Sequence, residues 1–213
     1  MSVIWESFMQ INSVSSTQLL YSSKQIAFKG NIQATKSISS DVFEKVIDID
    51  SRGVYPAGVL SNFTESHFKV DGVKVNSMEG FLQALKTSDV EEQKEVCKLV
   101  GIKAKRAGNK LKAREGYDAS VVYWRNQSMP RTSKEYQSLL KKAYESKYQY
   151  DSVFRKALNL TKGSKLTHSI GKSSALETIL TEQEFVDMLH YLRDEYKPNK
   201  IKVLIRTLMS KFF

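Results

Sequence analysis

Three side chains in the stretch 76–86 have the types and the spacing to act together in chemistry. Glu79, Gln83 and Lys86 are four and three residues apart, so a helix would stack them along one face. A carboxylate, an amide and an amine in a row can stabilise a positive charge, move a proton or hold hydroxyl groups. Gly80 and Ala84 flank this stripe and leave room for a close approach. The combination indicates a helix that lines a pocket, although an ordinary surface helix fits the periodicity alone slightly better.

An apolar stripe on the same stretch predicts what would hold this helix in place. Its residues recur at helical spacing and would face a core: Met78, Phe81, Leu82 and Leu85. Ser77 is suited to N-cap the helix, because its hydroxyl can accept a hydrogen bond from the first turn. We therefore expect a helix that is buried on its apolar side and open to a ligand on the other.

Before this helix the sequence predicts short β segments joined by loops. The extended segments are expected at 18–30, at 42–49 and in a hairpin over 68–75 that turns at Asp71-Gly72. A stretch with two glycines and a proline, 51–58, is expected to be a loop that enters a short segment at 59–63.

After this helix the sequence is mostly helical. Helices are predicted at 90–100 with Gly101 as the terminating residue, at 103–110, at 133–150 and from Thr181 to Pro198. The last of these begins with a capping box formed by Thr181 and Glu184. A short extended segment is predicted at 165–169, and a basic amphipathic helix at 201–213.

These elements predict one predominantly helical α+β domain with a small β portion. We place this domain at 46–196. A β-rich N-terminal extension at 1–45 is expected to pack on it, and the basic helix occupies 197–213.

Composition limits the class of protein. The 213 residues, 41% of them hydrophobic, suit one folded domain. No apolar run approaches the ~20 residues that span a bilayer, and no signal peptide is visible, which predicts a cytoplasmic protein without a membrane span. The net charge of +10 favours phosphorylated or polyanionic partners, including nucleic acid, although scattered lysines are by default a solvated surface. The oligomeric state does not follow from the sequence.

Familiar catalytic and metal motifs are absent. There is no Walker loop, no Gly-x-Gly-x-x-Gly, no His-Glu-x-x-His and no nucleophile-elbow serine. The one cysteine, Cys97, excludes an internal disulfide and a cysteine-rich metal site. His168 lies between glycine-bounded turns, where a structural and a functional role are equally compatible with the sequence. We expect no metal and no cofactor.

The residue types that are present suit the scission of a C–N bond at a sugar C1. Such a reaction passes through an oxocarbenium-like state and needs a carboxylate, with donors to hold the sugar hydroxyls. A flat surface for the base and positive charge for phosphates complete the requirements. The chain offers Glu79 as the carboxylate, and for the other roles Asn62, Gln83, Trp124, Arg52 and the backbone of Gly53. Most basic domains of this size offer as much, so these residue types alone do not single out the reaction.

Ordered sequence blocks resemble the NADAR family, whose domain is also called YbiA-like. They are Tyr55-Pro56 with Leu60-Ser61-Asn62-Phe63; Phe68-x-x-Asp71-Gly72; Ser77-Met78-Glu79-x-Phe81-x-Gln83-x-x-Lys86; Gly101-x-x-Ala104-Lys105; Tyr123-Trp124; Ser133-x-Glu135-Tyr136-Gln137; Leu166-Thr167-His168-Ser169-x-Gly171; and Leu180-Thr181-x-x-Glu184-Phe185 before Leu192-Arg193. Each block alone is weak, and their order over residues 50–193 is specific. No counterpart is visible for residues 1–45 or for the tail from Lys197.

The resemblance implies an N-glycosidase. Some NADAR proteins remove ADP-ribose from guanine in nucleic acid, and others cleave a phosphorylated ribosylamino-pyrimidine of the riboflavin pathway. It implies Glu79 as the acid, base or cation-stabilising group and Lys86 as the group that engages the opened ribose or a phosphate. Its implied substrate-binding residues are Arg52, Gly53, Asn62, Phe63, Gln83, Trp124 and His168.

Where many members carry an Asn-x-Trp-Gly-type segment, this chain reads His168-Ser169-Ile170-Gly171-Lys172, which bears on the identity of the substrate more than on the fold. The basic charge favours ADP-ribosylated guanine over the riboflavin intermediate. Two other classes stay open: a module that binds ADP-ribose or NAD without turnover, and a structural or assembly protein.

Overall fold

The computed structural model describes residues 45–198. The predicted extended segment at 18–30 and the predicted helix at 201–213 lie outside these residues, as do nearly all of the N-terminal extension and most of the C-terminal helix. Within residues 45–198 no helix is long and apolar enough to cross a membrane.

The strands form three separate two-stranded ribbons. β1 (Val46–Asp48) pairs in parallel with β6 (Lys165–Thr167), so that Ile47 lies opposite Leu166. β2 (Glu65–Val70) and β3 (Val73–Ser77) are antiparallel, as are β4 (Val121–Trp124) and β5 (Gln127–Pro130). The parallel pair brings the segment that follows β6 beside the loop that follows β1.

The β2–β3 hairpin confirms the turn predicted at Asp71-Gly72. Both residues have positive φ, 47° and 85°, which is the backbone that an Asp-Gly turn accepts with little strain. Side chains of β2 alternate between exposed and buried, with Phe68 and Val70 on the buried side. The hairpin leads directly into the next helix at Ser77.

Helices make up most of the fold, which is α+β as the sequence predicts. They are α1 (Ala57–Leu60), α2 (Met78–Ala84), α3 (Val90–Cys97), α4 (Gly101–Lys112), α5 (Lys134–Tyr150), α6 (Ser152–Asn159) and α7 (Glu182–His190), followed by a π-helical turn at Tyr191–Glu195. The N-caps predicted for α2 and α7 are confirmed: the Ser77 hydroxyl accepts from the Gly80 amide, and Thr181 and Glu184 form a capping box.

Several boundaries differ from those predicted. α3 ends at Cys97, and Gly101 begins α4 instead of ending α3; its positive φ of 53° re-aims the chain between the two helices. α1 occupies part of the segment expected at 59–63, and α6 was not predicted. α7 ends at His190 rather than at Pro198, because the π-helical turn takes over.

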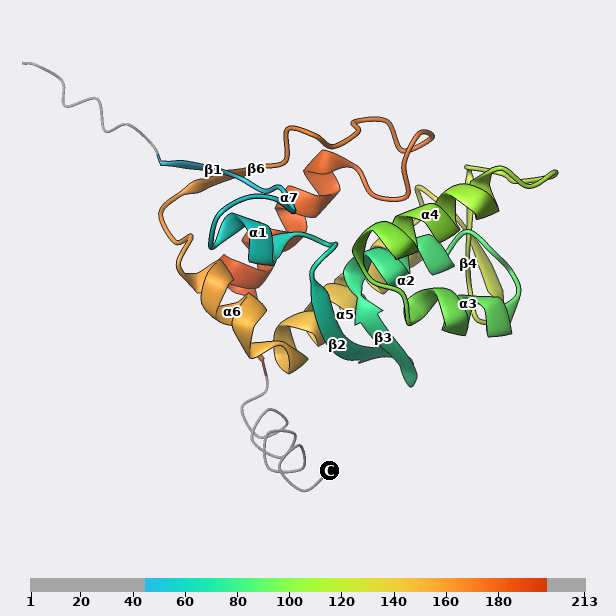
Figure 1. Cartoon of the computed structure of the whole chain (residues 1–213), viewed down its shortest axis with the longest axis horizontal. Coiled ribbons are helices and arrows are strands. Elements are labelled where there is room, and N and C mark those ends of the chain that lie inside the picture. Colours follow the sequence, from blue (N-terminus) through green and yellow to red (C-terminus); the bar gives the residue numbers. More distant parts are fainter. Residues whose placement is uncertain (1–44, 199–213) are drawn as a thin grey trace, which may run out of the picture. The chain divides into compact units, whose positions relative to one another are not determined.

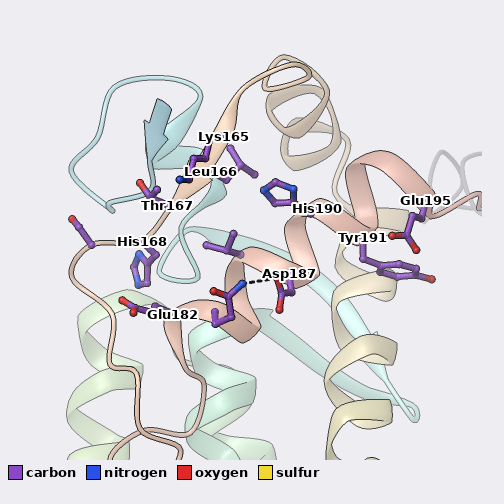
Figure 2. Close-up of a pocket in the computed structure, with 12 residues that line it drawn as sticks. Lys165, Leu166, Thr167, His168, Glu182, Asp187, His190, Tyr191 and Glu195 are labelled. Carbon is purple, nitrogen blue, oxygen red and sulfur yellow. Dashed lines mark hydrogen bonds between the residues drawn. The ribbon is translucent and has the colours of Figure 1, made fainter. Parts of the chain in front are cut away.

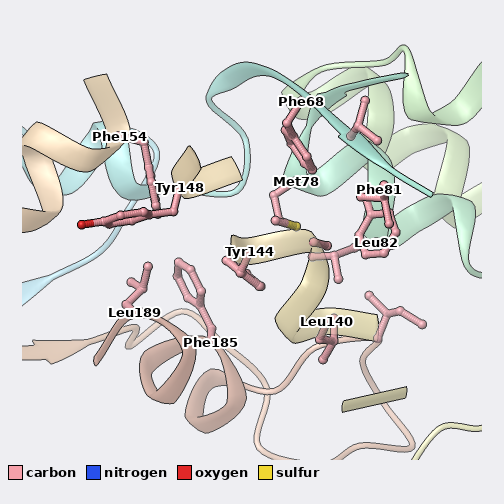
Figure 3. Close-up of a cluster of buried hydrophobic side chains, with 14 of the residues drawn as sticks. Phe68, Met78, Phe81, Leu82, Leu140, Tyr144, Tyr148, Phe154, Phe185 and Leu189 are labelled. Atoms are coloured by element: carbon pink, nitrogen blue, oxygen red, sulfur yellow. The ribbon is translucent and has the colours of Figure 1, made fainter. Parts of the chain in front are cut away.

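The core is built around α2, all seven residues of which are buried. Met78, Phe81 and Leu82 pack with side chains of α5 and α7, among them Tyr144 and Phe185 (Figure 3). α2 lies beside α3 and α4, as Figure 1 shows. A helix buried on all sides can place polar side chains at the base of a cavity.

Gly80 allows α3 to approach α2 closely. Its position beside the polar stripe had suggested that a ligand would approach there instead. A Cβ at this position would lie 2.6 Å from the Leu99 carbonyl oxygen and 3.0 Å from that of Val96. Ala84 is fully buried as well. The expectation of open space beside these two residues is therefore wrong, because residues 96–99 lie against Gly80 and Ala84 is buried in the core.

Candidate active site

A cavity of about 380 Å³ lies along the face of α2 that carries Glu79, Leu82 and Gln83. Its wall combines segments that are far apart in the sequence: the loop after β1, the end of α1, α2, α4, the segment after β6 and the start of α7. The lining includes Asp50, Ser51, Arg52, Ser61, Asn62, Phe63, Glu79, Leu82, Gln83, Lys105, His168, Ile170, Gly171, Lys172, Thr178, Ile179, Leu180, Thr181 and Phe185. Six of the nine predicted site residues are among them.

Glu79 is a buried carboxylate in the wall of this cavity, with 6% of its surface exposed. Its Oε1 accepts a hydrogen bond from Gln83 Nε2 at 2.8 Å and lies 3.5 Å from the Lys105 ammonium. Within residues 45–198 no group bonds its other oxygen, Oε2. A buried carboxylate is costly unless it is paired, so the lysine offsets part of that cost while one oxygen stays available to a ligand.

Gln83 is held between Glu79 and α4. Its Nε2 must face the carboxylate, which can only accept, so its Oε1 points toward Gly108 on α4. A Cβ at Gly108 would lie only 1.6 Å from this Oε1. Lys105 and Gly108, three residues apart on α4, therefore face Glu79 and Gln83, four residues apart on α2.

Asn62 presents its amide to the cavity from the end of α1. Its Oδ1 accepts a hydrogen bond from the Tyr144 hydroxyl at 2.9 Å, which leaves the NH2 group to donate. Burial raises the pKa of Tyr144 well above its ordinary value, although the bond to Asn62 opposes this, so the phenol stays a donor. Asn62 is thereby oriented to hold a hydroxyl or carbonyl group of a ligand.

The ring of His168 is held by a hydrogen bond and by an aromatic contact. Its Nδ1 lies 2.7 Å from the Ile49 carbonyl oxygen, which can only accept, so Nδ1 carries a proton. The ring meets Phe185 edge to face at 5.0 Å. Nε2 is the nitrogen that is left for a ligand.

The rim of the cavity carries positive charge. Arg52 is exposed and lies 3.3 Å from Asp50, and Lys172 is exposed on the segment after β6. The backbone amide of Arg52 and then its guanidinium hold the pKa of Asp50 below its ordinary value. Phe63 lines the cavity beside Asn62, whereas Gly53 does not reach it.

Lys86 does not line the cavity. Its Nζ donates to the Gly108 carbonyl oxygen at 3.4 Å, and the side chain lies in a separate shallow hollow with Leu111 and Tyr117. Burial, followed by the neighbouring charge of Lys105, lowers its pKa to about 8, although Glu79 opposes the shift. Lys86 follows the end of α2 at Ala84, whereas Glu79 lies in its first turn.

Trp124 also lies away from the cavity. It is 3% exposed, packs edge to face on Phe81 at 5.1 Å and donates from Nε1 to Asp71 at 3.0 Å. It holds the β2–β3 turn against the core. The flat surfaces that do line the cavity are Phe63 and Phe185.

Lys105 is the functional candidate that reasoning from helical periodicity missed. Lys86 continues the stripe of Glu79 on one helix, whereas Lys105 comes from a different helix. The signal was present in the Gly101-x-x-Ala104-Lys105 block, because buried Ala104 fixes the face of α4 that packs inward.

A buried ion pair holds the far wall of the cavity. The guanidinium of Arg131, 1% exposed, donates to both carboxylate oxygens of Glu184, at 2.9 and 2.6 Å, and to the Thr178 carbonyl at 3.2 Å. Glu184 also accepts from the Thr181 amide at 2.7 Å. These bonds fix the segment 178–181 against α7.

A second, larger hollow of about 780 Å³ lies on the other side of His168. Its lining includes Glu182, Asp187 and His190 of α7 and Lys165 of β6 (Figure 2). Among residues 45–198 no group of three or more His, Cys, Asp or Glu side chains is arranged to hold a metal ion. The hollow lacks a counterpart of the buried Glu79, so we take the smaller cavity as the candidate active site.

Comparisons with known proteins match this region. The family model described as "Bacteriophage protein GP30.3" matches residues 54–194. An uncharacterized 17.1 kDa protein in the Gp30-rIII intergenic region of Enterobacteria phage T4 is 36% identical over 149 residues, which are 70% of this chain and 97% of that protein. The NMR structure of the E. coli protein YbiA is similar with a TM-score of 0.49 and 17% identity, over 78% of this chain and 88% of that one.

Proposed function

This chain belongs to the Bacteriophage protein GP30.3 family, and we propose that it is an N-glycosidase that hydrolyses the C–N bond between a ribose and a nitrogenous base. The preferred substrate is ADP-ribosylated guanine, in nucleic acid or as a nucleoside.

The setting of Glu79 carries this proposal. A carboxylate that is buried, held at one oxygen and open at the other is suited to stabilise a cation that develops in front of it. Asn62 and His168 supply polar groups around the same space, and Phe63 and Phe185 supply flat apolar surface. The resemblance of these sequence blocks to the NADAR family supports the same reaction.

In the proposed reaction the bond between ribose C1 and the nitrogen of the base breaks, and its electron pair leaves with the nitrogen. The positive charge that develops on C1 and the ring oxygen is stabilised by Glu79 Oε2. A water oxygen then bonds to C1, Glu79 accepts one of the water protons, and this proton passes to the departing nitrogen. For the preferred substrate the products are ADP-ribose and an unmodified guanine, which stays in its strand or nucleoside.

Positive charge at the rim supports a phosphate-bearing substrate. Arg52, Lys105 and Lys172 line the cavity, and the chain carries a net charge of +10. A diphosphate on the ribose would lie near these groups if C1 lies against Glu79.

The test incubates the protein with a guanine-ADP-ribosylated oligonucleotide and measures the release of ADP-ribose by mass spectrometry. We expect Glu79→Gln to lose about 10²- to 10⁴-fold in rate, because it removes the charge while keeping the shape. The affinity of this variant for ADP-ribose, measured by titration calorimetry, should change little. Glu115→Gln, which changes an exposed carboxylate outside the cavity, is the matched control and should keep the wild-type rate.

Release at the wild-type rate by Glu79→Gln would remove this mechanism. Binding of ADP-ribose without release by the wild-type protein would instead indicate a non-catalytic reader, and turnover of the phosphorylated ribosylamino-pyrimidine alone would indicate the smaller substrate.

A further inference from the structure

We infer that the outer face of α4 is a docking surface for a single strand of nucleic acid, which it guides to the cavity. The inference deepens the proposed function, since it concerns the form in which the substrate is presented. The surface consists of Lys103, Arg106 and Lys110, which we call the α4 stripe.

The α4 stripe is an uncompensated row of positive charge. Its members follow at i, i+3 and i+7 on one side of the helix, and all three are exposed. α4 contains no acidic residue, and within residues 45–198 no member of the stripe forms an ion pair or a side-chain hydrogen bond. Repulsion among like charges is relieved when an anion binds.

The neighbouring helix α3 shows the contrasting arrangement. Its acidic side chains are each paired with a cation: Glu91 with Lys94 at 2.6 Å, Glu95 with Lys98 at 2.5 Å and Glu92 with Arg114 at 2.6 Å. The carboxylates of α3 are thus already paired and do not neutralise the α4 stripe, whose charge is left to an outside partner.

The spacing of the stripe fits a phosphate backbone. Lys103 and Lys110 are seven residues apart, which is about 10 Å along the helix. Each of its three cations can contact one phosphate of a strand, so the stripe can bind about three phosphates. A membrane surface fits less well, because the apolar residues Ala104 and Leu111 of α4 are buried and only Ile102 is an exposed large apolar side chain.

The helix that carries the stripe borders the cavity. α4 begins at Gly101, where a Cβ would lie 3.3 Å from the carbonyl oxygen of Phe63, a residue of the cavity wall. Lys105 of the same helix reaches Glu79. Because Glu79 is recessed, a modified base must leave a duplex stack to reach it, which favours a single strand over a duplex.

The test compares two triple variants of the full chain by fluorescence anisotropy with an unmodified single-stranded DNA 15-mer. Lys103→Gln/Arg106→Gln/Lys110→Gln removes the stripe. Lys134→Gln/Lys156→Gln/Lys162→Gln removes the same charge from exposed lysines outside α4 and is the control.

We expect loss of the stripe to reduce the slope of log affinity against log salt by about 2, at about 0.7 per phosphate contact. The wild-type protein should therefore lose roughly 20-fold more affinity than the stripe variant between 50 and 200 mM salt. The control should keep the wild-type slope. Equal slopes for the two variants, no DNA binding by the wild-type protein, or stripe-dependent binding to anionic vesicles in place of DNA would overturn the inference.

Activity separates this inference from the proposed function. On an ADP-ribosylated guanosine the stripe variant should keep the wild-type kcat/KM, because the stripe does not line the cavity, whereas on a modified oligonucleotide its KM should rise at least several-fold. Stripe-dependent DNA binding without any hydrolysis by the wild-type protein would contradict the glycosidase and leave the docking surface standing. Hydrolysis of both substrates by the stripe variant with unchanged KM would contradict the docking surface and leave the glycosidase standing.

Discussion

At the scale of single residues, the partner of Glu79 decides where charge acts in this site. Lys105 lies 3.5 Å from the carboxylate, whereas Lys86 lies beyond the end of α2 and its amine donates to the Gly108 carbonyl oxygen. The lysine that continues the sequence stripe is thus not the one that reaches the cavity.

We predict that Lys105→Gln lowers kcat/KM by about tenfold or more, because it removes a charge beside the reacting group. Lys103→Gln changes a residue on the same helix that faces outward. With a nucleoside substrate, its kcat/KM should stay within about twofold of the wild-type value. Steady-state kinetics of the two variants checks this, with Lys86→Gln as a third measurement. Equal losses in all three would mean that net charge matters and position does not.

Gly108 gives a second prediction at this scale. An alanine usually stabilises a helix interior by 0.5–1 kcal/mol relative to glycine, but here its Cβ would overlap Gln83 Oε1. We expect Gly108→Ala to lower the free energy of unfolding by about 1–3 kcal/mol and to reduce turnover, since Gln83 can no longer hold Glu79. Urea unfolding and kinetics provide the measurements.

The double variant Gly108→Ala/Gln83→Ala provides the control. It removes the overlap, so stability should recover while turnover stays low. Stability equal to or above wild type in the single Gly108→Ala variant would show that α4 can move away from α2.

At the scale of elements, the Arg131–Glu184 pair joins the segment before α5 to α7 and fixes the cavity wall between them. Arg131→Met leaves a partly buried carboxylate without its partner, so we expect a loss of about 3–5 kcal/mol in unfolding free energy. The double variant Arg131→Met/Glu184→Gln should recover part of this loss in the same urea experiment. No recovery would mean that packing of the long arginine side chain, and not the ion pair, is what counts.

Lys147 on α5 gives the opposite case, a buried charge without an ionic partner. It is fully buried, its Nζ lies 4.5 Å from the centre of the Phe154 ring, and no hydrogen bond to it forms within residues 45–198. Burial lowers its pKa to about 8, although Asp151 opposes the shift. Between pH 8 and 10.5 the unfolded chain therefore binds the proton more tightly than the folded one, and the contribution of Lys147 to stability rises with pH.

We predict that Lys147→Met raises the unfolding free energy by about 1–3 kcal/mol at pH 7, where the charge is fully buried. The gain should shrink as pH rises through 8 and vanish near 10.5. Urea unfolding of both proteins at several pH values checks the trend. A gain that does not depend on pH would mean that the methionine acts by packing and not by removing the charge.

At the scale of the whole molecule, several carboxylates titrate below their ordinary range. The Ser169 hydroxyl and amide lower the pKa of Asp48, which joins β1 to the segment after β6. Burial raises the pKa of Glu184, but hydrogen bonds from Arg131 and the Thr181 amide outweigh it and the net shift is downward. Burial also raises the pKa of Asp71, but hydrogen bonds from Lys142 and Trp124 outweigh it, so its pKa is lowered as well.

We therefore expect the contribution of these carboxylates to stability to be fully present above about pH 4.3 and to be lost as pH falls further. The unfolded chain takes up protons there before the folded one does. Thermal unfolding from pH 7 to pH 2.5 measures this, and Glu184→Gln should show a shallower decline. A melting temperature that stays constant down to pH 3 would contradict it.

Much of the fold was predictable because its signals are local. The Asp71-Gly72 turn, the Ser77 cap, the capping box at Thr181 and the long helix of α5 depend on hydrogen bonds and periodicities that span a few residues. Glu79 and Gln83 were identified for the same reason, since four residues on a helix always share a face. The predicted α+β class is confirmed.

What tertiary structure alone decided are contacts between residues far apart in the sequence. Lys105 meets Glu79, Gly108 receives Gln83 and Arg131 reaches Glu184 because helices pack in one relative position, and periodicity within a helix does not contain that position. Trp124 likewise lies in the core, because burial of a large aromatic ring stabilises the fold more than partial exposure in a cavity wall would. The sequence by itself therefore determined which faces and turns form, and packing determined which of their side chains share the cavity.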